Sequence, residues 1–528
     1  MITILYKINN GAIRYNAETI IENVNIEIKD NEKIAVIGNN GSGKSSLLKL
    51  IADEISLSKR SSDEEINIEK YGKINIGYLK QISESDWEYT LEEEINTVYK
   101  PVIELMKEMD SLVEKMSEDP STENIEKYTE AQEEFFRLGG YEYSKDLELI
   151  LNKLGFKQCD YERKIKEFSG GEQTKIALAK IILSKPDIML LDEPTNHLDV
   201  DMIEWLENYI NHYEKAVVIV SHDRMFLDNV VHKVYEIEHK TITKYSGNYT
   251  DFIKQKQINM ELHIKKYEEQ QKQIERLKKI VERFKHIPSK SAMAKAKLKY
   301  IERVEKIDMP KKFDLRKFHV NLEPTKSSSR EVFRANKLQV GYESVMLEIS
   351  FLLEKGQKLA LMGKNGTGKS TFLKTIMGEI NALGGTFNWG NNVDIGYYEQ
   401  HVVNVCSEKT VLDDFWDEFQ DLSQNEVRSY LGAFLFGQDN VYKKVSNLSG
   451  GERARLSLAK IFKRQPNVLI LDEPTNHMDL IGKETLEDII MQYSGTVIFV
   501  THDRYFAKKV ADSLLVFNEN EVEFTKKL

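Results

Sequence analysis

The chain has 528 residues, enough for several domains of about 100–200 residues each, and 41% of them are hydrophobic, which excludes a fibrous or disordered chain. Its 74 basic and 85 acidic residues give a net charge of −11, which excludes a uniformly basic coat for nucleic acid. Cys159 and Cys406 lack the spacing of a disulfide framework or a zinc site. Because no run approaches the ~18 apolar residues of a membrane span and the first residues do not follow a signal-peptide pattern, we expect a soluble, cytoplasmic protein.

Three motifs occur twice along the chain, in the same order. The glycine-rich segment 38–46 recurs at 363–371, the SGGE segment 169–181 recurs at 449–461, and the LDEPTNH segment 190–199 recurs at 469–479. Such a repeat predicts two domains of one α/β type. We place them at residues 1–245 and 319–528, joined by a separate segment at 246–318.

The glycine-rich segments have the pattern of phosphate loops. Each follows an apolar run that predicts a buried strand and precedes a predicted helix, so backbone N–H groups and the start of the helix would surround phosphate oxygens. Lys44 and Lys369 would reach the terminal phosphates of ATP, and Ser45 and Ser370 would hold Mg²⁺. The predicted loop residues are Gly38, Asn39, Asn40, Gly41, Ser42, Gly43, Lys44, Ser45 and Ser46 in the first copy, and Gly363, Lys364, Asn365, Gly366, Thr367, Gly368, Lys369, Ser370 and Thr371 in the second.

The first copy contains an insertion that the second lacks. The offset between matching residues is 319 at Gln81 and Gln400 but 280 from Ser169 and Ser449 onward, so the first copy has 319 − 280 = 39 extra residues between these motifs. Two helical stretches separated by Asp119 and Pro120 predict a helical arm at about 95–141. A solvated surface insertion without a partner is the alternative.

The SGGE segments each precede a helix rich in alanine and leucine. Their small residues would offer a second helix N-terminus for phosphate in each copy. The predicted binding residues here are Ser169, Gly170, Gly171 and Glu172, and their equivalents Ser449, Gly450, Gly451 and Glu452.

The LDEPTNH segments end a second apolar run in two carboxylates. The first carboxylate of each pair, Asp192 or Asp472, is suited to Mg²⁺, and the second, Glu193 or Glu473, would polarise an attacking water. A histidine follows each glutamate after 29 residues and would face the γ-phosphate, and a glutamine after a strand-like run would contact the metal and the water. These residues are His222 and Gln81 in the first copy, and His502 and Gln400 in the second.

The segment between the copies has a distinct composition. Apolar residues recur every seven positions from Ile253 to Val281, which predicts a long helix, and the pattern breaks at 286–289 before it resumes, which predicts a helical hairpin. Residues 251–317 hold 20 Lys or Arg against 10 Asp or Glu, so this hairpin has a net charge of +10 in an acidic protein. The charge indicates a bound polyanion, and a solvated charged coiled coil is the alternative.

With both copies of every motif in place, the sequence resembles the ABC ATPase family over about 450 residues. This resemblance implies two P-loop α/β cores, each with a helical subdomain, arranged head to tail around two composite ATP sites. The first site would set Lys44, Asp192, Glu193 and His222 against Ser449 to Gly451, and the second would set the mirrored residues against Ser169 to Gly171. The resemblance also implies that Tyr15 and Tyr342 stack on adenine.

The inserted arm and the basic hairpin further resemble the ABC-F branch of that family. This resemblance implies a partner in the 70S ribosome, with contacts to the exit-site region of the 23S rRNA and to the peptidyl-site tRNA, and no DNA or stable membrane partner. The compact arm and the break at 286–293 are similar to resistance members, which protect the ribosome from lincosamides, pleuromutilins and streptogramin A. A housekeeping translation factor is the alternative, and an ATPase subunit of a transporter is a third.

Overall fold

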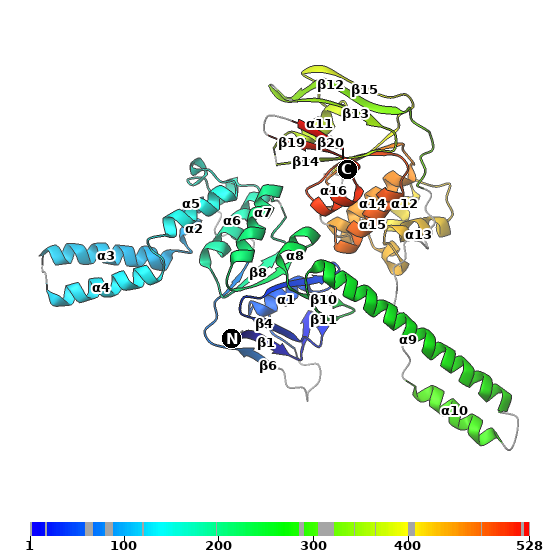
Figure 1. The fold of residues 1–528 in the computed structure, drawn as a ribbon, viewed down its shortest axis with the longest axis horizontal. Helices are drawn as coiled ribbons and strands as arrows, with labels where there is room; N and C mark the ends of the chain where they lie inside the picture. The colour runs from blue at the N-terminus through cyan, green and yellow to red at the C-terminus, as the bar shows by residue number, and fades with distance from the viewer. Residues whose placement is uncertain are drawn as a thin grey trace.

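The structure is a computed structural model that describes residues 3–15, 18–58, 67–79, 88–118, 121–196, 198–284, 290–304, 322–342, 344–364, 366–399, 407–476, 478–518 and 522–526. Six positions named above lie outside these ranges, namely Gln81, Asp119, Pro120, Asn365, Gln400 and Cys406, as do residues 286–289 of the expected hairpin tip. Figure 1 shows two α/β lobes from which two helical pairs extend in different directions.

The first lobe is built on a six-stranded sheet with the order β11-β10-β5-β9-β8-β7. All neighbouring strands are parallel except β10 and β11, which are antiparallel. Because parallel strands are covered on both faces, β8 and β9 are continuous apolar runs. The strands are β5 (Lys33–Gly38), β7 (Ile76–Tyr78), β8 (Ile188–Asp192), β9 (Ala216–Val220), β10 (Lys233–Glu238) and β11 (Thr241–Ser246).

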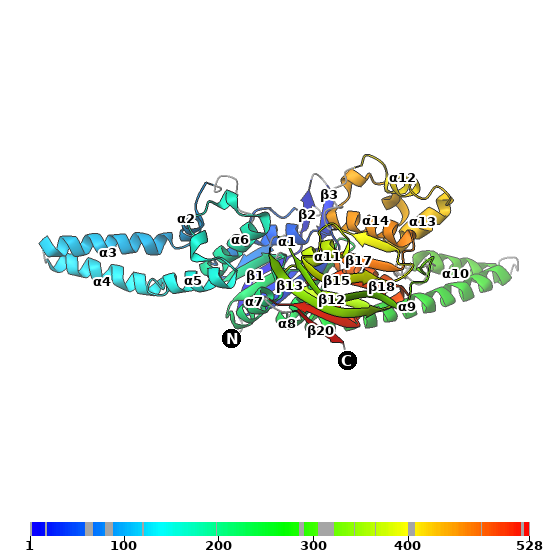
Figure 2. The same ribbon diagram turned by 90° about the horizontal axis from the view of Figure 1, so that it is seen from above.

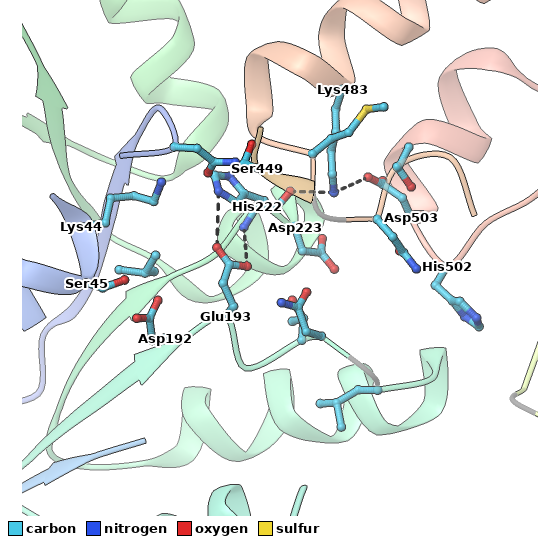
Figure 3. Close-up of a pocket in the computed structure, with 18 of the residues that line it drawn as sticks. Lys44, Ser45, Asp192, Glu193, His222, Asp223, Ser449, Lys483, His502 and Asp503 are labelled. Atoms are coloured by element: carbon cyan, nitrogen blue, oxygen red, sulfur yellow. Dashed lines mark hydrogen bonds and ion pairs between the residues drawn. The ribbon is translucent and has the colours of Figure 1, made fainter. Parts of the chain in front are cut away.

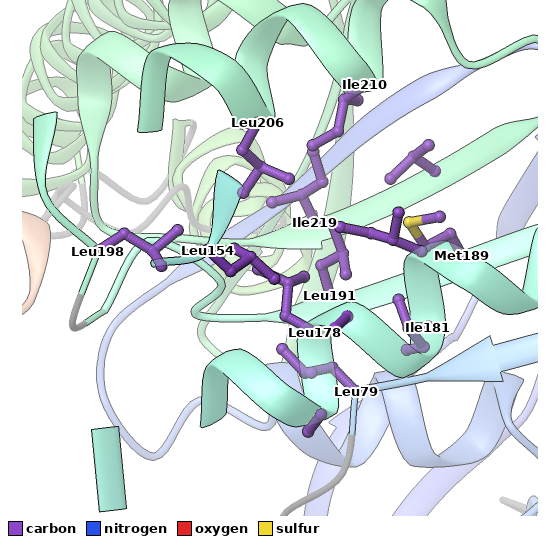
Figure 4. Close-up of a cluster of buried hydrophobic side chains, with 14 of the residues drawn as sticks. Leu79, Leu154, Leu178, Ile181, Met189, Leu191, Leu198, Leu206, Ile210 and Ile219 are labelled. Carbon is purple, nitrogen blue, oxygen red and sulfur yellow. The ribbon is translucent and has the colours of Figure 1, made fainter. Parts of the chain in front are cut away.

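Helices α6 (Gly170–Ser184) and α7 (Val200–His212) cover one face of this sheet. Figure 4 shows Leu178 and Ile181 of α6 and Leu206 of α7 beside Met189 and Leu191 of β8, and all five side chains are buried. This packing fixes the carboxyl end of β8, where the predicted carboxylates follow. Helices α2 (Leu91–Asn96), α5 (Tyr143–Lys153) and α8 (Arg224–Val230) complete this side of the lobe.

The other face of the sheet packs against α1 (Lys44–Ile51), a three-stranded sheet and a hairpin. Alternate residues of the central strands, such as Ile188 and Leu190, point to this face, and Leu47 of α1 and Tyr6 of β1 join them in one buried cluster. The additional strands are β1 (Ile4–Asn9), β2 (Ala12–Tyr15), β3 (Glu18–Glu22), β4 (Ile26–Lys29) and β6 (Asn67–Lys70), with β4-β1-β6 forming the sheet and β2-β3 the hairpin.

The second lobe repeats this architecture. Its main sheet has the order β16-β17-β18-β14-β19-β20, which matches the first sheet strand for strand, and a smaller sheet has the order β13-β12-β15. The prediction of two tandem α/β domains is therefore confirmed. The strands are β12 (Glu331–Gly341), β13 (Val345–Glu354), β14 (Lys358–Gly363), β15 (Gly384–Trp389), β16 (Ile395–Tyr398), β17 (Val468–Asp472), β18 (Thr496–Val500), β19 (Ser513–Phe517) and β20 (Val522–Lys526). The helices are α11 (Lys369–Ile376), α12 (Val411–Trp416), α13 (Gln424–Ala433), α14 (Gly450–Lys463), α15 (Leu480–Gln492) and α16 (Arg504–Val510).

Two antiparallel helical pairs extend from the body (Figures 1 and 2). Helices α3 (Lys100–Glu118) and α4 (Thr122–Arg137) occupy the segment where the sequence predicts an arm. Helices α9 (Tyr249–Phe284) and α10 (Ser291–Arg303) occupy the basic segment between the copies, and Ile274 and Ile301 are buried between them. Among the described residues, no helix combines the length and the apolar character that a membrane span requires.

Candidate nucleotide-binding site at the domain interface

The first phosphate loop joins β5 to α1. Lys44 begins the helix, and its Nζ donates to the carbonyl oxygens of Gly38 at 2.8 Å and Asn39 at 3.1 Å, so the amine lies over the loop. Gly43 has a φ of 100°, and a Cβ there would lie 2.7 Å from Cγ2 of Ile20. The loop therefore requires glycine at this point, and it leaves the N–H groups at the start of α1 facing open space.

The second phosphate loop has the same construction between β14 and α11. Nζ of Lys369 donates to the carbonyl oxygens of Gly363 at 2.7 Å and Lys364 at 2.5 Å. Gly368 has a φ of 92°, and a Cβ there would lie 3.0 Å from Leu347. Both copies thus hold the lysine of the loop in the same position.

The predicted carboxylates lie at the ends of β8 and β17. Asp192 is the last residue of β8, and Glu193 follows it with a φ of 50°, a left-handed conformation that is uncommon for a residue with a side chain. The backbone N–H of Glu193 donates to the carbonyl of Val220 at 2.8 Å, which aligns it with the end of β9. Glu473 after Asp472 has a φ of 49° and the equivalent bond to Val500 at 3.1 Å.

A histidine faces each of these glutamates. The backbone N–H of His222 donates to Oε2 of Glu193 at 3.3 Å, and its Nε2 lies 3.5 Å from Oε1 of the same carboxylate. Nε2 of His502 lies 3.3 Å from Oε1 of Glu473. The structure therefore brings together the glutamate and the histidine that the sequence predicts to act on the same phosphate.

The SGGE segments form helix starts. Ser169 is the N-cap of α6, and Glu172 accepts hydrogen bonds from the backbone N–H and the hydroxyl of Ser169, each at 2.8 Å. Ser449 and Glu452 form the same capping box at α14, with a 2.8 Å bond from the serine N–H. Sequence analysis missed this role, although Ser-x-x-Glu before a helix is its known signal. The nucleotide contacts of these residues remain a prediction.

A cavity of about 1040 Å³ lies between the two copies. Figure 3 shows Lys44, Ser45, Asp192, Glu193 and His222 of the first copy around it, with Ser449 of the second copy on the opposite side. The lining of this cavity thus contains most of the residues predicted for the first composite site. Ser169, Gly171, Glu473 and His502 also line it, whereas none of the described lining residues belongs to the second phosphate loop. The mirrored pairing of Lys369 with Ser169 remains a prediction.

Comparison with known proteins identifies the family of this chain. Family models described as ABC transporter match residues 21–196, 346–476 and 235–320. ABC transporter F family member 5 of Arabidopsis thaliana is 34% identical, over 98% of this chain and 75% of the relative. The chain belongs to the ABC-F family. The ATP-binding protein YdiF of Bacillus subtilis is 41% identical, over 98% of this chain and 81% of that protein.

Solved structures share the fold of this ABC-F protein. An RNase-L inhibitor structure has a TM-score of 0.62 at 19% identity and covers 98% of this chain and 89% of its own. A model of ribosome-bound archaeal Pelota and ABCE1 has a TM-score of 0.60 at 19% identity and covers 98% of this chain and 78% of its own. Together with the family match, the duplicated ATPase domains make this protein an ATPase.

Burial gives the two glutamates of this ABC-F protein different proton affinities. Burial raises the pKa of Glu193 to about 7, against the opposing effect of Lys44. Burial also acts on Glu473, but hydrogen bonds from His502 and Asn476 hold its pKa below the ordinary value. Burial, with Lys44 nearby, lowers the pKa of His222 to about 3, so this imidazole is neutral near pH 7 and faces Glu193 as a hydrogen-bonding group.

The residues of the cavity fit ATP and Mg²⁺. Among its lining residues, Glu193 Oε1 and His222 Nδ1 are buried without a hydrogen-bond partner, and such atoms are costly unless a bound group or water pairs with them. No cluster of three or more His, Cys, Asp or Glu side chains in the described ranges is arranged to hold a metal ion. Ser45 and Asp192 line the cavity and would hold Mg²⁺ together with nucleotide phosphates and water.

Two arginines at equivalent positions cross the domain interface. Arg224 of α8 donates to both carboxylate oxygens of Glu487 at 3.0 and 3.2 Å, and Arg504 of α16 pairs with Glu207. The two pairs are equivalent in the repeat. Arg504 corresponds to Arg224, since 504 − 224 = 280, and Glu487 corresponds to Glu207, since 487 − 207 = 280. Sequence analysis missed these pairs, although the His-Asp-Arg tripeptide shared by both copies was a signal for them.

The two tyrosines proposed to stack on adenine lie at the surface. Tyr15 ends β2 and is 71% exposed, and Tyr342 follows β12 and is 63% exposed. Neither lines the cavity. Their rings are accessible to a base, and the stacking role remains a prediction.

Proposed function

We propose that this ABC-F protein is a cytoplasmic factor that binds the 70S ribosome at the tRNA exit site, and that its ATPase cycle controls this binding. The observation that carries the proposal is the basic hairpin: residues 251–317 have a net charge of +10 within a chain of net charge −11. Helices α9 and α10, which form the described part of this segment, extend away from the body (Figure 2). RNA is the polyanion that such a surface attracts, and the fold shared with ribosome-bound ABCE1 favours the same partner.

The hairpin is proposed to contact the 23S rRNA and the peptidyl-site tRNA. Its exposed cations include Lys272, Arg276, Lys278, Lys279, Lys295 and Lys299. They lie on both helices near the far end of the hairpin, so they would meet nucleic acid before the acidic body does. Each phosphate contact would release counterions, which makes the binding sensitive to salt.

Substitution of Lys279, Lys295 and Lys299 with glutamine is expected to weaken ribosome binding and to lower its salt dependence. Each lost phosphate contact removes roughly one unit from the slope of log affinity against log salt concentration. The measurement is co-sedimentation with 70S ribosomes at several salt concentrations. A matched control replaces Lys145, Lys153 and Lys337, which are exposed on the body. Equal weakening by both triple variants would contradict a specific role of the hairpin.

We further propose that the hairpin protects the ribosome from lincosamide, pleuromutilin and streptogramin A antibiotics by acting near the peptidyl-transferase centre. Expression in a sensitive host is expected to raise the inhibitory concentration of at least one of these drugs. Substitutions at 286–293 are expected to remove protection while ATPase activity persists. Unchanged susceptibility, with a growth defect on deletion, would favour a housekeeping translation factor instead.

A further inference from the structure

A lysine of the second domain reaches into the first nucleotide site. Lys483 lies on α15, is only 8% exposed, and its Nζ donates to the backbone carbonyl of His222 at 3.0 Å and to Oδ2 of Asp503 at 2.9 Å. Figure 3 shows this amine between the two histidine loops. Lys483 thus joins the loop of His222 in the first domain to the loop of His502 in the second.

The charge of Lys483 is supported by carboxylates from both domains. Burial acts to lower its pKa, but Asp503 and Asp223 hold that pKa above the ordinary value, and Glu193 adds to their effect. A buried cation is retained only where such partners satisfy it, because removing one partner leaves an unpaired buried charge that strongly destabilises the fold. In this arrangement of the domains, carboxylates of both domains therefore keep the Lys483 amine in its charged form.

The residue equivalent to Lys483 in the first domain cannot make the same contact. The repeat offset of 280 places Ile203 of α7 at the position equivalent to Lys483, and Ile203 is buried in the core of the first domain. Isoleucine has no side-chain donor, so it cannot hold the carbonyl of His502 as Lys483 holds that of His222. The arginine pairs of the interface follow the repeat, whereas this lysine breaks it.

We propose that Lys483 is a positioning residue that ties the His222 loop to the second domain, so that hydrolysis at the Glu193 site depends on domain arrangement through a contact that the Glu473 site lacks. The peptide that Lys483 holds belongs to the residue whose N–H donates to Glu193, so displacement of this loop displaces a partner of the proposed base. This inference rests on the assignment of Glu193 and Glu473 as the two groups that polarise water.

The test measures each site separately in the full-length protein. Glu473→Gln leaves the Glu193 site active, and Glu193→Gln leaves the Glu473 site active. Adding Lys483→Ile, which copies the residue at 203, is expected to lower kcat about 10-fold in the Glu473→Gln protein, because small misplacement of a catalytic group has effects of this order or larger. KM for ATP is expected to stay within about two-fold. In the Glu193→Gln protein, the same substitution is expected to lower kcat by no more than about two-fold, because Lys483 contacts Asp503 in the second domain but does not hold the peptide of His502.

Two further variants separate positioning from folding. Lys483→Arg, which retains donors and charge, is expected to restore at least about half of the lost rate, and Lys483→Met, which keeps only the length, is expected to reproduce the loss. Because Lys483 and the second phosphate loop share a domain, an intact Glu473 site verifies that this domain is folded.

Several outcomes would overturn the inference, and they are distinguishable. An equal loss at both sites, or no loss at the Glu193 site, would remove the selective role of Lys483 while leaving both bases in place. Abolition of all turnover by either single glutamine substitution would make the two sites one functional unit. Full turnover in both single variants would instead reject the assignment of the bases.

Discussion

Replacing Glu193 and Glu473 together with glutamine is expected to lower ATP turnover by a factor of about 10²–10⁴, because an amide cannot accept a proton from the attacking water. ATP binding is expected to persist, since Lys44 and Lys369 remain in their loops. Phosphate release measures the first effect and titration with labelled ATP the second. In the proposed function, this variant stays bound to 70S ribosomes in the presence of ATP, whereas the wild-type protein dissociates.

A control for the glutamine variant changes carboxylates without touching the cavity. Glu142 and Glu379 are exposed and lie outside its lining, so their double replacement with glutamine is expected to leave turnover unchanged. If the Glu193 and Glu473 variant hydrolyses ATP at the wild-type rate, these residues are not the bases. If it is inactive but leaves ribosomes as fast as the wild type, the link between hydrolysis and release is wrong.

Gly43→Ala is expected to weaken ATP binding at the first site by a factor of about 10 or more. A left-handed conformation costs a residue with a side chain about 1–2 kcal/mol, and each 1.4 kcal/mol is about tenfold in affinity. The new methyl group would also meet Ile20, at 2.7 Å from its Cγ2, and would push the loop away from the start of α1. Titration with labelled ATP in a Lys369→Ala background isolates the first site.

Gly72→Ala is the matched control for this loop. Gly72 has a similar φ of 96°, but a Cβ there would meet nothing within 4 Å, and the residue lies outside the cavity lining. It carries the conformational cost alone, so it is expected to lower the melting temperature slightly and to leave ATP affinity unchanged. Equal ATP affinities for the two alanine variants would show that the 38–46 loop does not bind the nucleotide.

Sequence patterns predicted those elements that depend on residues close together in the chain. A buried strand, a glycine loop and a helix in succession identify the phosphate loops, and the observed β5, Lys44 and α1 follow that order. The heptad pattern from Ile253 to Val281 predicted a long helix, which is α9. The resumed pattern after 286–289 predicted a second helix, which is α10, and this helix ends at Arg303 because Val304 has an extended backbone.

Contacts between the domains were not predictable in the same way. Arg224 and Glu487 are 263 residues apart, and no local pattern states that they meet. Their duplication in the repeat was nevertheless a usable signal. Lys483 had no such signal, since Ile203 occupies the equivalent position, and only the three-dimensional arrangement reveals its bond to His222. The motifs predict which residues bind the nucleotide, and the structure was needed to show which residues connect the two domains beside them.

The mounting of α9 has a mechanical consequence. Its first turns are anchored in the first domain through buried Tyr249 and Phe252, and its remaining length stands free of that core. At about 1.5 Å per residue, its 36 residues measure roughly 54 Å, so a rotation of about 10° at the anchored end moves the far end by roughly 9 Å. A small rotation at the anchored end is thereby converted into a much larger displacement at Phe284, the far end of α9, and of the basic side chains near it.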